Sequence, residues 1–254
     1  MAVEAATFDI KFRERYLAME LYIENNVLLG FEKYTMWKED EYIHIVVPDT
    51  VTEIAQRAFD GCERIVGVTI PGSVKTIGEE AFFCCRNLQE IVMGEGIETI
   101  GNSAFEMGFF GDVLIFPNSL RSIGARAFCD TRMTRMRLPK DLKSIGAQAF
   151  TSCMNLESVS VPGTVTVVPK DAFACCWYLE EAVLAEGIRC IEADAFFECR
   201  KLTEIKLPQS LTHLDKDAFR ECRQIEKVRL PEHLKDQAEG AFRDVYPEVE
   251  YIRY

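Results

Sequence analysis

An Ala-Phe pair recurs along most of the chain at an almost constant interval. Successive phenylalanines of these pairs are 23 residues apart, with one interval of 22. They are Phe59, Phe82, Phe105, Phe128, Phe150, Phe173, Phe196, Phe219 and Phe242. A period of about 20 to 50 residues is typical of a solenoid, whose units bury their apolar side only against their neighbours. The repeat therefore predicts one elongated stack of coils and leaves no room for a second core.

Each unit also predicts a short strand that ends near a proline. Apolar residues stand six, three and one positions before that proline, as Ile65, Val68 and Ile70 do before Pro71. The last two alternate with other residues, which is the period of a half-buried strand. Proline cannot donate to a ladder, so we expect the strand to end there. Stacking the units then predicts a parallel sheet along one side of the coils.

The rest of each unit predicts a turn and a second core column. Two more apolar positions follow the proline, and a glycine often comes next, at Gly78, Gly101, Gly124 and Gly146. We expect a tight turn with positive φ at these glycines. Other residues stand at the same position in Ala55, Pro169, Glu192 and Asp215. The Ala-Phe pair should lie in a short helical or irregular segment, with its phenylalanines stacked inside.

The two ends of the chain depart from the repeat. Residues 1–41 do not fit it, and two β-prone runs, LYI and VLL, flank Glu24-Asn25-Asn26. We interpret 1–41 as an N-terminal cap containing a β-hairpin, and 42–254 as the solenoid with a degenerate final unit. In that unit Gln237 replaces an apolar residue, and the segment 249–254 could supply a closing strand.

Several stretches resemble the BspA-like class of leucine-rich repeats. VKTIGEEAFFCCRNLQEIVMGEGIETIGNSAF and LTHLDKDAFRECRQIEKVRLP carry the resemblance, which covers about residues 42 to 242. The short unit AFCDTRMTRMRLP resembles a variant with Thr131 where cysteine is usual. The resemblance implies a right-handed solenoid of leucine-rich-repeat type, with short parallel β-strands on the concave face and turns and short helical segments elsewhere. It also implies a protein-binding or adhesive surface and no reaction.

Composition narrows the classes of partner. The chain has a net charge of -12 and no clustered Lys and Arg, which argues against nucleic-acid binding through counterion release. No stretch approaches the roughly 20 apolar residues of a membrane-spanning helix. The N-terminus lacks the basic and apolar regions of a secretory signal, which favours a cytoplasmic protein, whereas the family resemblance suggests a surface or secreted one. We expect a monomer.

Six of the ten cysteines stand three residues after a repeat phenylalanine. They are Cys62, Cys85, Cys153, Cys176, Cys199 and Cys222. One cysteine per coil predicts an inward column of free thiols, because free cysteine packs as a small hydrophobe. Neighbouring coils would bring two Cα atoms within disulfide range, but a linear stack does not converge on a metal. Cys84 and Cys175 are the more plausible reactive thiols if either is exposed.

The sequence gives no pattern for catalysis or for a cofactor. The three histidines have no fixed relation to a nucleophile and an orienting acid. No phosphate-binding loop, dinucleotide fingerprint or HExxH zinc motif occurs. Acids such as Asp171, Asp194 and Asp217 precede Ala-Phe pairs and are interpreted as a solvated face or as charges at a helix N-terminus. We expect no enzyme, no cofactor and no metal site.

A protein partner is expected on the exposed positions of the strands, two and four residues before each proline. These positions are apolar in the first half of the chain and charged in the second. Aromatic pairs in the preceding loops are further candidates, since aromatic residues often dominate binding energy. The candidate residues are Val46, Thr69, Val92, Val113, Ile115, Arg135, Arg137, Phe109, Phe110, Trp177 and Tyr178.

Three functions remain open from the sequence. The first is a non-enzymatic interaction module, adaptor or adhesin-like, that binds a protein through the concave sheet. The second is a structural spacer without a dedicated ligand, and a more distant third is an enzyme built on the loops. The aromatic candidates also have a packing alternative, because Phe109 or Phe110 could fill the space left by Gly108 and Gly111.

Overall fold

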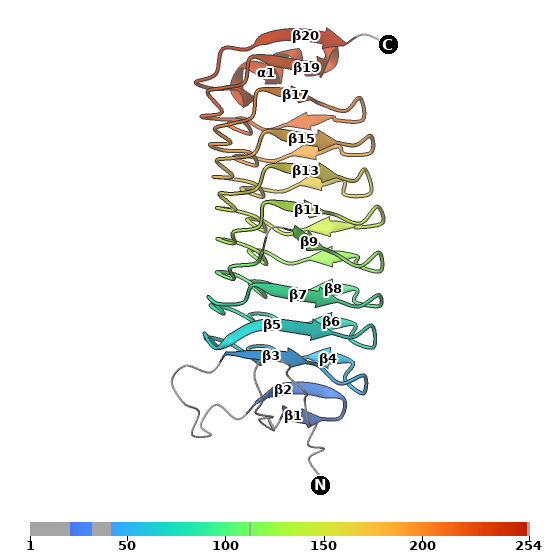
Figure 1. The fold of residues 1–254 in the computed structure, drawn as a ribbon. Helices are drawn as coiled ribbons and strands as arrows, with labels where there is room; N and C mark the ends of the chain where they lie inside the picture. Colours follow the sequence, from blue (N-terminus) through green and yellow to red (C-terminus); the bar gives the residue numbers. More distant parts are fainter. Residues whose placement is uncertain (1–20, 32–41, 112, 253–254) are drawn as a thin grey trace.

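The structure is a computed structural model that describes residues 21–31, 42–111 and 113–252. It is a column of stacked coils, with β1 at one end and β20 at the other (Figure 1). Most coils contribute one longer strand and, after a turn, one strand of two residues. The longer strands are β3 (Ile43–Val46), β5 (Ile65–Ile70), β7 (Glu90–Met93), β9 (Val113–Ile115), β11 (Arg135–Arg137), β13 (Ser158–Val161), β15 (Glu181–Leu184), β17 (Glu204–Lys206), β19 (Lys227–Pro231) and β20 (Glu248–Ile252). The two-residue strands are β4 (Glu53–Ile54), β6 (Thr76–Ile77), β8 (Thr99–Ile100), β10 (Ser122–Ile123), β12 (Ser144–Ile145), β14 (Val167–Val168), β16 (Cys190–Ile191) and β18 (His213–Leu214).

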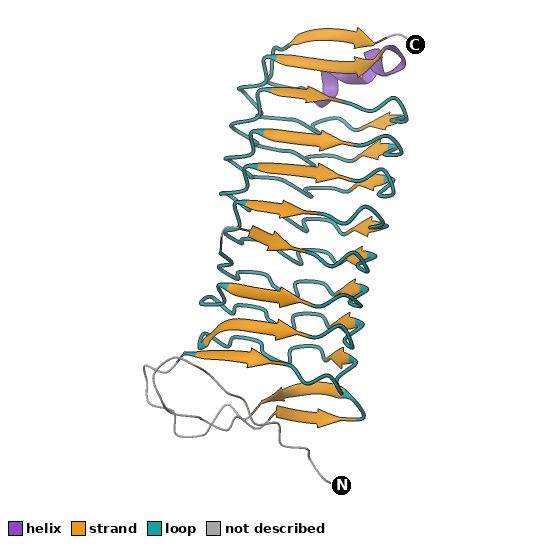
Figure 2. Ribbon diagram, turned by 45° about the vertical axis from the view of Figure 1, so that its right-hand side comes forward, coloured by secondary structure: helices purple, strands orange, loops and turns teal. Residues whose placement is uncertain are grey.

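The longer strands form the parallel ladder that the repeat predicts, and the two-residue strands form a second parallel ladder, which the sequence does not predict. The pairing follows the unit, so that Val68 of β5 lies opposite Ile91 of β7, and Ile205 of β17 lies opposite Val228 of β19. Each ladder is interrupted once among the described residues. The longer strands are not paired between β7 and β9, and the short strands are not paired between β12 and β14. The interruptions fall at different levels of the column. Figure 2 shows the longer and the two-residue strands as two separate rows of arrows.

A third ladder runs through the Ala-Phe segments, although they are turns and not helices. The N–H groups of Arg57, Phe59 and Gly61 donate to carbonyl oxygens of the next coil, at 3.0, 2.7 and 2.8 Å. The residue before Ala and the second residue after Phe have positive φ in nearly every coil, as Glu80 (54°) and Cys84 (55°) do. Few side chains favour this conformation. The bonds to the next coil hold them in it.

The phenylalanine column is a continuous stack of rings in the core. Neighbouring ring centroids are 4.8 to 5.6 Å apart, from Phe31 to Phe242. The eight rings from Phe59 to Phe219 are fully buried. The stack begins at Phe31, which the repeat does not include, so the strand before the first coil already supplies a ring.

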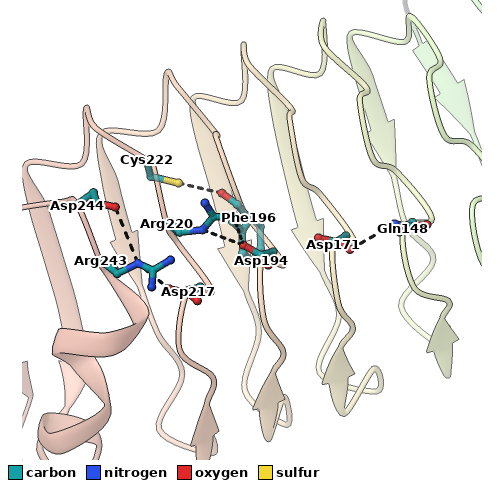
Figure 3. Close-up of polar contacts among 9 residues, drawn as sticks. All are labelled: Gln148, Asp171, Asp194, Phe196, Asp217, Arg220, Cys222, Arg243 and Asp244. Carbon is teal, nitrogen blue, oxygen red and sulfur yellow. Dashed lines mark hydrogen bonds and ion pairs between the residues drawn. The ribbon is translucent and has the colours of Figure 1, made fainter.

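The structure confirms that the cysteine column packs inward. Cys85 Sγ donates to the carbonyl oxygen of Phe59 at 3.2 Å, and Cys222 Sγ donates to that of Phe196 at 2.9 Å (Figure 3). The acceptor belongs to the preceding coil in both cases, so the thiol adds a bond between coils. Burial raises the pKa of the Cys153 thiol to about 12. The Cys153 thiol is therefore protonated at neutral pH, which disfavours the reactive thiolate.

The expectation of positive φ at the repeat glycines is wrong. Gly78 and Gly124 do not have positive φ, but a Cβ atom on either would lie 2.6 or 2.5 Å from a backbone nitrogen of the preceding coil. These glycines are required by the close approach of two coils. They follow strands of the ladder that ends at β12. Beyond the interruption, Pro169, Glu192 and Asp215 take the position after β14, β16 and β18.

The two ends differ from the coils between them. Strands β1 (Leu21–Glu24) and β2 (Val27–Phe31) form an antiparallel hairpin whose turn residues, Asn25 and Asn26, have positive φ, and β2 then pairs with β4. The remainder of the predicted cap, 1–20 and 32–41, lies outside the described residues. At the other end a short 3-10 helix, Glu232–Leu234, leads into α1 (Lys235–Ala241), and β20 is the closing strand.

Candidate partner-binding surface

Three exposed apolar side chains of the longer strands lie on β7 and β9, in neighbouring coils. The exposed fractions are 45% for Val92, 59% for Val113 and 70% for Ile115. Arg135 and Arg137 on β11 lie directly opposite Val113 and Ile115. We call these five residues the β7–β9 patch. The structure thus brings together five of the eleven residues that the sequence nominates.

The patch coincides with the interruption of the longer ladder, and Phe110 explains why the coil is irregular there. Phe110 is buried and packs edge-to-face on Phe105 and Phe128, with centroids 5.9 and 6.1 Å apart. A Cβ atom on Gly108 would lie 2.7 Å from the Phe110 ring. Phe110 therefore fills space that a side chain at position 108 would need. The prediction that Phe110 binds a partner is therefore wrong, because its ring packs inside the coil, as the alternative prediction for this residue states.

The two arginines of the patch differ in their bonding. Arg135 donates to the Glu157 carboxylate from Nε and Nη2, both at 3.2 Å. The exposed Arg137 side chain makes no hydrogen bond or ion pair with any residue that the structure describes. A cation of this kind beside apolar side chains is available to a negatively charged group of a partner.

Two sheet candidates lie apart from the patch. Val46 is exposed on β3, in the same column as Val92 but two coils away. Thr69 lies between them and is partly buried, with its hydroxyl 3.1 Å from His44 Nε2. The column is thus interrupted by a polar contact. Val183 on β15 is also exposed and occupies the same strand position as Val92, although it is not among the candidate residues.

The loop aromatics carry arginine side chains on their faces. The Arg132 guanidinium lies 4.1 Å from the Phe109 ring centroid, and Arg200 lies 4.3 Å from that of Trp177. The Trp177 indole also donates to Glu198 at 3.2 Å, so its polar atom is already bonded. Tyr178 is exposed. Trp177 and Tyr178 belong to a coil three repeats beyond Phe109 and do not join the patch.

The row of acids before the Ala-Phe pairs is bonded to basic and amide groups. Gln148 Nε2 donates to Asp171 at 3.3 Å, Arg220 donates to Asp194 at 3.0 Å, and Arg243 pairs with Asp217 at 3.1 Å (Figure 3). These acids lie in turns, so the helix N-terminus considered for them is not present. Arginines balance the charges of Asp194 and Asp217, whereas Asp171 is bonded to an uncharged amide.

The remaining chemistry-bearing residues are dispersed. His44 and His233 bond within the fold, the latter with Nε2 2.7 Å from the Leu211 carbonyl oxygen. Burial raises the pKa of the Cys84 and Cys175 thiols, which disfavours the reactive thiolate. Within the described ranges, no three His, Cys, Asp or Glu side chains are grouped so that they could hold a metal ion. The helix of the described chain is too short and too polar to cross a bilayer.

The fold resembles two solved bacterial leucine-rich repeat proteins. The protein from T. pallidum is 24% identical with a TM-score of 0.62, and the match covers 93% of this chain and 97% of that one. The protein from Bacteroides ovatus is 18% identical with a TM-score of 0.51, and the match covers 96% of this chain and all of that one. At these identities the likeness shows the fold alone. A search of the curated proteins gave no match.

A family model extends over most of the sequence. The model, the BspA type leucine rich repeat region, matches six copies within residues 32–154 and 166–250. These ranges contain most of the predicted units and most strands of both parallel ladders, with β13 lying between the two ranges. Repeats of this kind generally serve protein interaction or structure and are typically non-enzymatic. The matched units and the stacked coils show that the chain belongs to the BspA-type leucine-rich repeat family.

Proposed function

We propose that the protein is a non-enzymatic interaction module that binds a protein partner through the β7–β9 patch. One observation supports this more than any other, which is that Val92, Val113 and Ile115 are the exposed apolar residues that lie together on the strand surface. Apolar residues exposed singly are normal, whereas contiguous ones mark interaction sites. An adaptor or an adhesin would both use such a surface.

Charge supports the same surface. The whole chain carries a net charge of -12, yet β11 places Arg135 and Arg137 at the edge of the patch. Arginine is enriched at protein interfaces because its planar group can stack and make several hydrogen bonds. A partner with an apolar contact and an acidic group at its rim would match the patch in both properties.

The interrupted ladder adds a third reason. Between β7 and β9 the described backbone is joined by the bond from Gly111 N–H to the Gln89 carbonyl oxygen, at 2.7 Å, in place of a regular ladder. The patch therefore lies where the regular pairing of the longer strands is broken, and it combines apolar side chains with a cation in neighbouring coils.

The test compares two variants that each introduce two lysines into the same column of the sheet. Val92→Lys with Ile115→Lys alters the patch, and Ser160→Lys with Val183→Lys is the matched control on β13 and β15. A partner captured from the source cells by cross-linking is purified, and its affinity is measured for the folded native protein and both variants. We expect the patch variant to lose about tenfold or more in affinity.

The control should bind as the native protein does. Equal binding by the patch variant and the native protein would contradict the assignment. If no purified candidate binds the native protein, the spacer function is favoured instead. A patch variant that fails to fold would show that Val92 and Ile115 are needed for the core, contrary to their exposure.

A further inference from the structure

The inward-facing side chains of the longer strands become partly exposed in the last strand, β20. Val228 and Leu230 of β19 are fully buried. Val249 and Tyr251 of β20 stand directly opposite them, yet are 36% and 37% exposed. Side chains at the same strand positions are thus buried in β19 and partly exposed in β20. Figure 1 shows β20 as the last strand of the column, with α1 close to it.

A hollow lies beside these two open side chains. Its volume is about 780 Å³, and Phe242, Val245 and Ala238 belong to its wall together with Val249 and Tyr251. Phe242 carries the last ring of the stack. Charged residues also line the hollow, namely Lys235, Asp236, Glu239, Arg243 and Asp244. The hollow therefore adjoins the end of the core and offers apolar contacts within a wall that is partly charged.

The outer edge of β20 has main-chain groups available for pairing. The Glu248 N–H donates to the Glu226 carbonyl oxygen at 2.7 Å, so the main chain of Glu248 faces β19. Bonding directions alternate along a parallel strand. The N–H and C=O groups of Val249 and Tyr251 consequently face away from the column, where the described structure places no further strand.

Charge on the outward rows indicates which strand would pair there. Arg229 of β19 lies 3.1 Å from Glu204 on β17 and 2.9 Å from Glu250 on β20. Lys227 lies opposite Glu248. The outward-facing side chains are thus basic on β19 and acidic on β20. A further strand would therefore meet Glu248 and Glu250, and like charges directly opposite are destabilising.

We propose that the free edge of β20 binds an extended segment of a partner protein in which Lys or Arg alternates with apolar residues. The apolar side chains enter the hollow over Phe242, and the basic side chains pair with Glu248 and Glu250. The main chain of the segment bonds to Val249 and Tyr251, as in β-strand addition. This site is separate from the β7–β9 patch and does not depend on it.

The probe is the peptide KVRLKVRL, which has the alternation of Lys227–Leu230, and the charge-reversed control is EVELEVEL. Binding to the full chain is measured by fluorescence anisotropy of the labelled peptides. We expect the basic peptide to bind at least tenfold more tightly than the acidic one, and its affinity to fall as salt is added. Equal affinity for the two peptides, or no binding of either, would overturn the proposal.

The variant Val249→Pro tests the main-chain bonds. It removes an N–H that faces away from β19, a position where an edge strand accepts proline. We expect a tenfold or greater loss of affinity with little change in the urea midpoint, whereas Val249→Ala keeps the N–H and should lose less. If the proline variant does not fold, N-methylation of alternate residues of the peptide makes the same test on the ligand.

The remaining outcomes also discriminate. The Val92→Lys, Ile115→Lys variant should bind KVRLKVRL as the native protein does, and a loss there would place the peptide on the patch instead. Sedimentation without peptide should show no end-to-end dimer through β20. A dimer that Val249→Pro abolishes would mean that the occupant of the edge is a second copy of the chain.

Discussion

Phe150 illustrates how a single residue contributes to every neighbouring coil. Its ring is fully buried between those of Phe128 and Phe173, with centroids 5.6 and 5.4 Å away. Replacing it with alanine removes contacts to two coils and leaves a cavity that the backbone ladders cannot close. We expect Phe150→Ala to lower the free energy of unfolding by about 3 to 5 kcal/mol. Urea denaturation measures it.

The control for this prediction is Phe109→Ala, a truncation of the same side chain in a partly exposed loop. It removes a contact with Arg132, and we expect a cost of less than about 1 kcal/mol. Similar costs for the two variants would contradict a special role of the stack.

Gly124 gives a second test at this scale. A Cβ atom there would lie 2.5 Å from the backbone nitrogen of Asn102, so two coils must separate to admit it. We expect Gly124→Ala to destabilise the protein by about 1 to 3 kcal/mol. At Gly240 in α1 the nearest atom would be 3.5 Å away, and Gly240→Ala should instead stabilise the helix by up to about 1 kcal/mol. Chemical denaturation of both variants decides the matter.

The buried columns could be predicted from the residue spacing. Which of two adjacent phenylalanines is buried in an irregular unit could not. The positions of the phenylalanine and cysteine columns follow from the 23-residue repeat alone. Phe109 and Phe110 are adjacent and chemically identical, and only the space above Gly108 decides that Phe110 turns inward. The size of that space depends on how the neighbouring coils pack, and a local sequence pattern does not contain this information.

At the scale of elements, two coils have Gly94 or Ala185 in place of the usual turn proline, and Glu-Gly follows in both. The Glu95 carboxylate accepts hydrogen bonds from the N–H groups of Asn118 and Ser119, and Ser119 Oγ accepts one from Gly96. The same contacts recur between Glu186 and the N–H groups of the next coil at Gln209 and Ser210. Each Glu-Gly turn is therefore held by the coil that follows it.

These turns predict a dependence on acid. The Asn118 N–H holds the pKa of Glu95 below its usual value, and the Gln209 N–H does the same for Glu186. Because the folded pKa is the lower one, the contribution to stability is present above the unfolded pKa of about 4.3 and is lost as the pH falls through the folded value. The double variant Glu95→Gln, Glu186→Gln should lose stability less steeply on acidification below pH about 5.

Urea midpoints measured across that pH range test the sign. Glu53→Gln with Glu226→Gln serves as the charge-matched control, because both residues are exposed and neither side chain forms a hydrogen bond or ion pair with any described residue. Identical pH profiles for the two double variants would contradict the role of the turns.

Elements differ in how far the sequence predicts them. The longer strands follow from the apolar alternation before each proline, and the hairpin of β1 and β2 follows from Asn25-Asn26. The turn segments do not follow, because residues such as Arg57 rarely adopt positive φ and do so here under bonds from the next coil. The ladder interruptions depend on distances between coils and have no local signal.

For the whole molecule, the staggered interruptions matter more than either one alone. Where the longer ladder stops between β7 and β9, the short ladder continues from β8 to β10. Where the short ladder stops after β12, the longer one continues from β11 to β13. No level of the column loses both ladders. The coils consequently remain coupled along the entire described length.

We therefore expect a single cooperative unfolding transition despite the two interruptions. Urea unfolding followed by tryptophan fluorescence and by far-ultraviolet circular dichroism should give coincident midpoints. Separate midpoints would show that one interruption divides the column into independent units. Hydrogen exchange would then place the division, because amides on its two sides would differ in protection.

The direction of the three ladders has a mechanical consequence. Their hydrogen bonds point from one coil to the next, along the axis of the column, so tension between the two ends loads successive coils in series. Such a chain should yield at low force by peeling from an end, one coil after another. Each 23-residue unit would release about 75 Å of contour length. The protein would then extend under force in equal steps, each corresponding to the unfolding of one repeat.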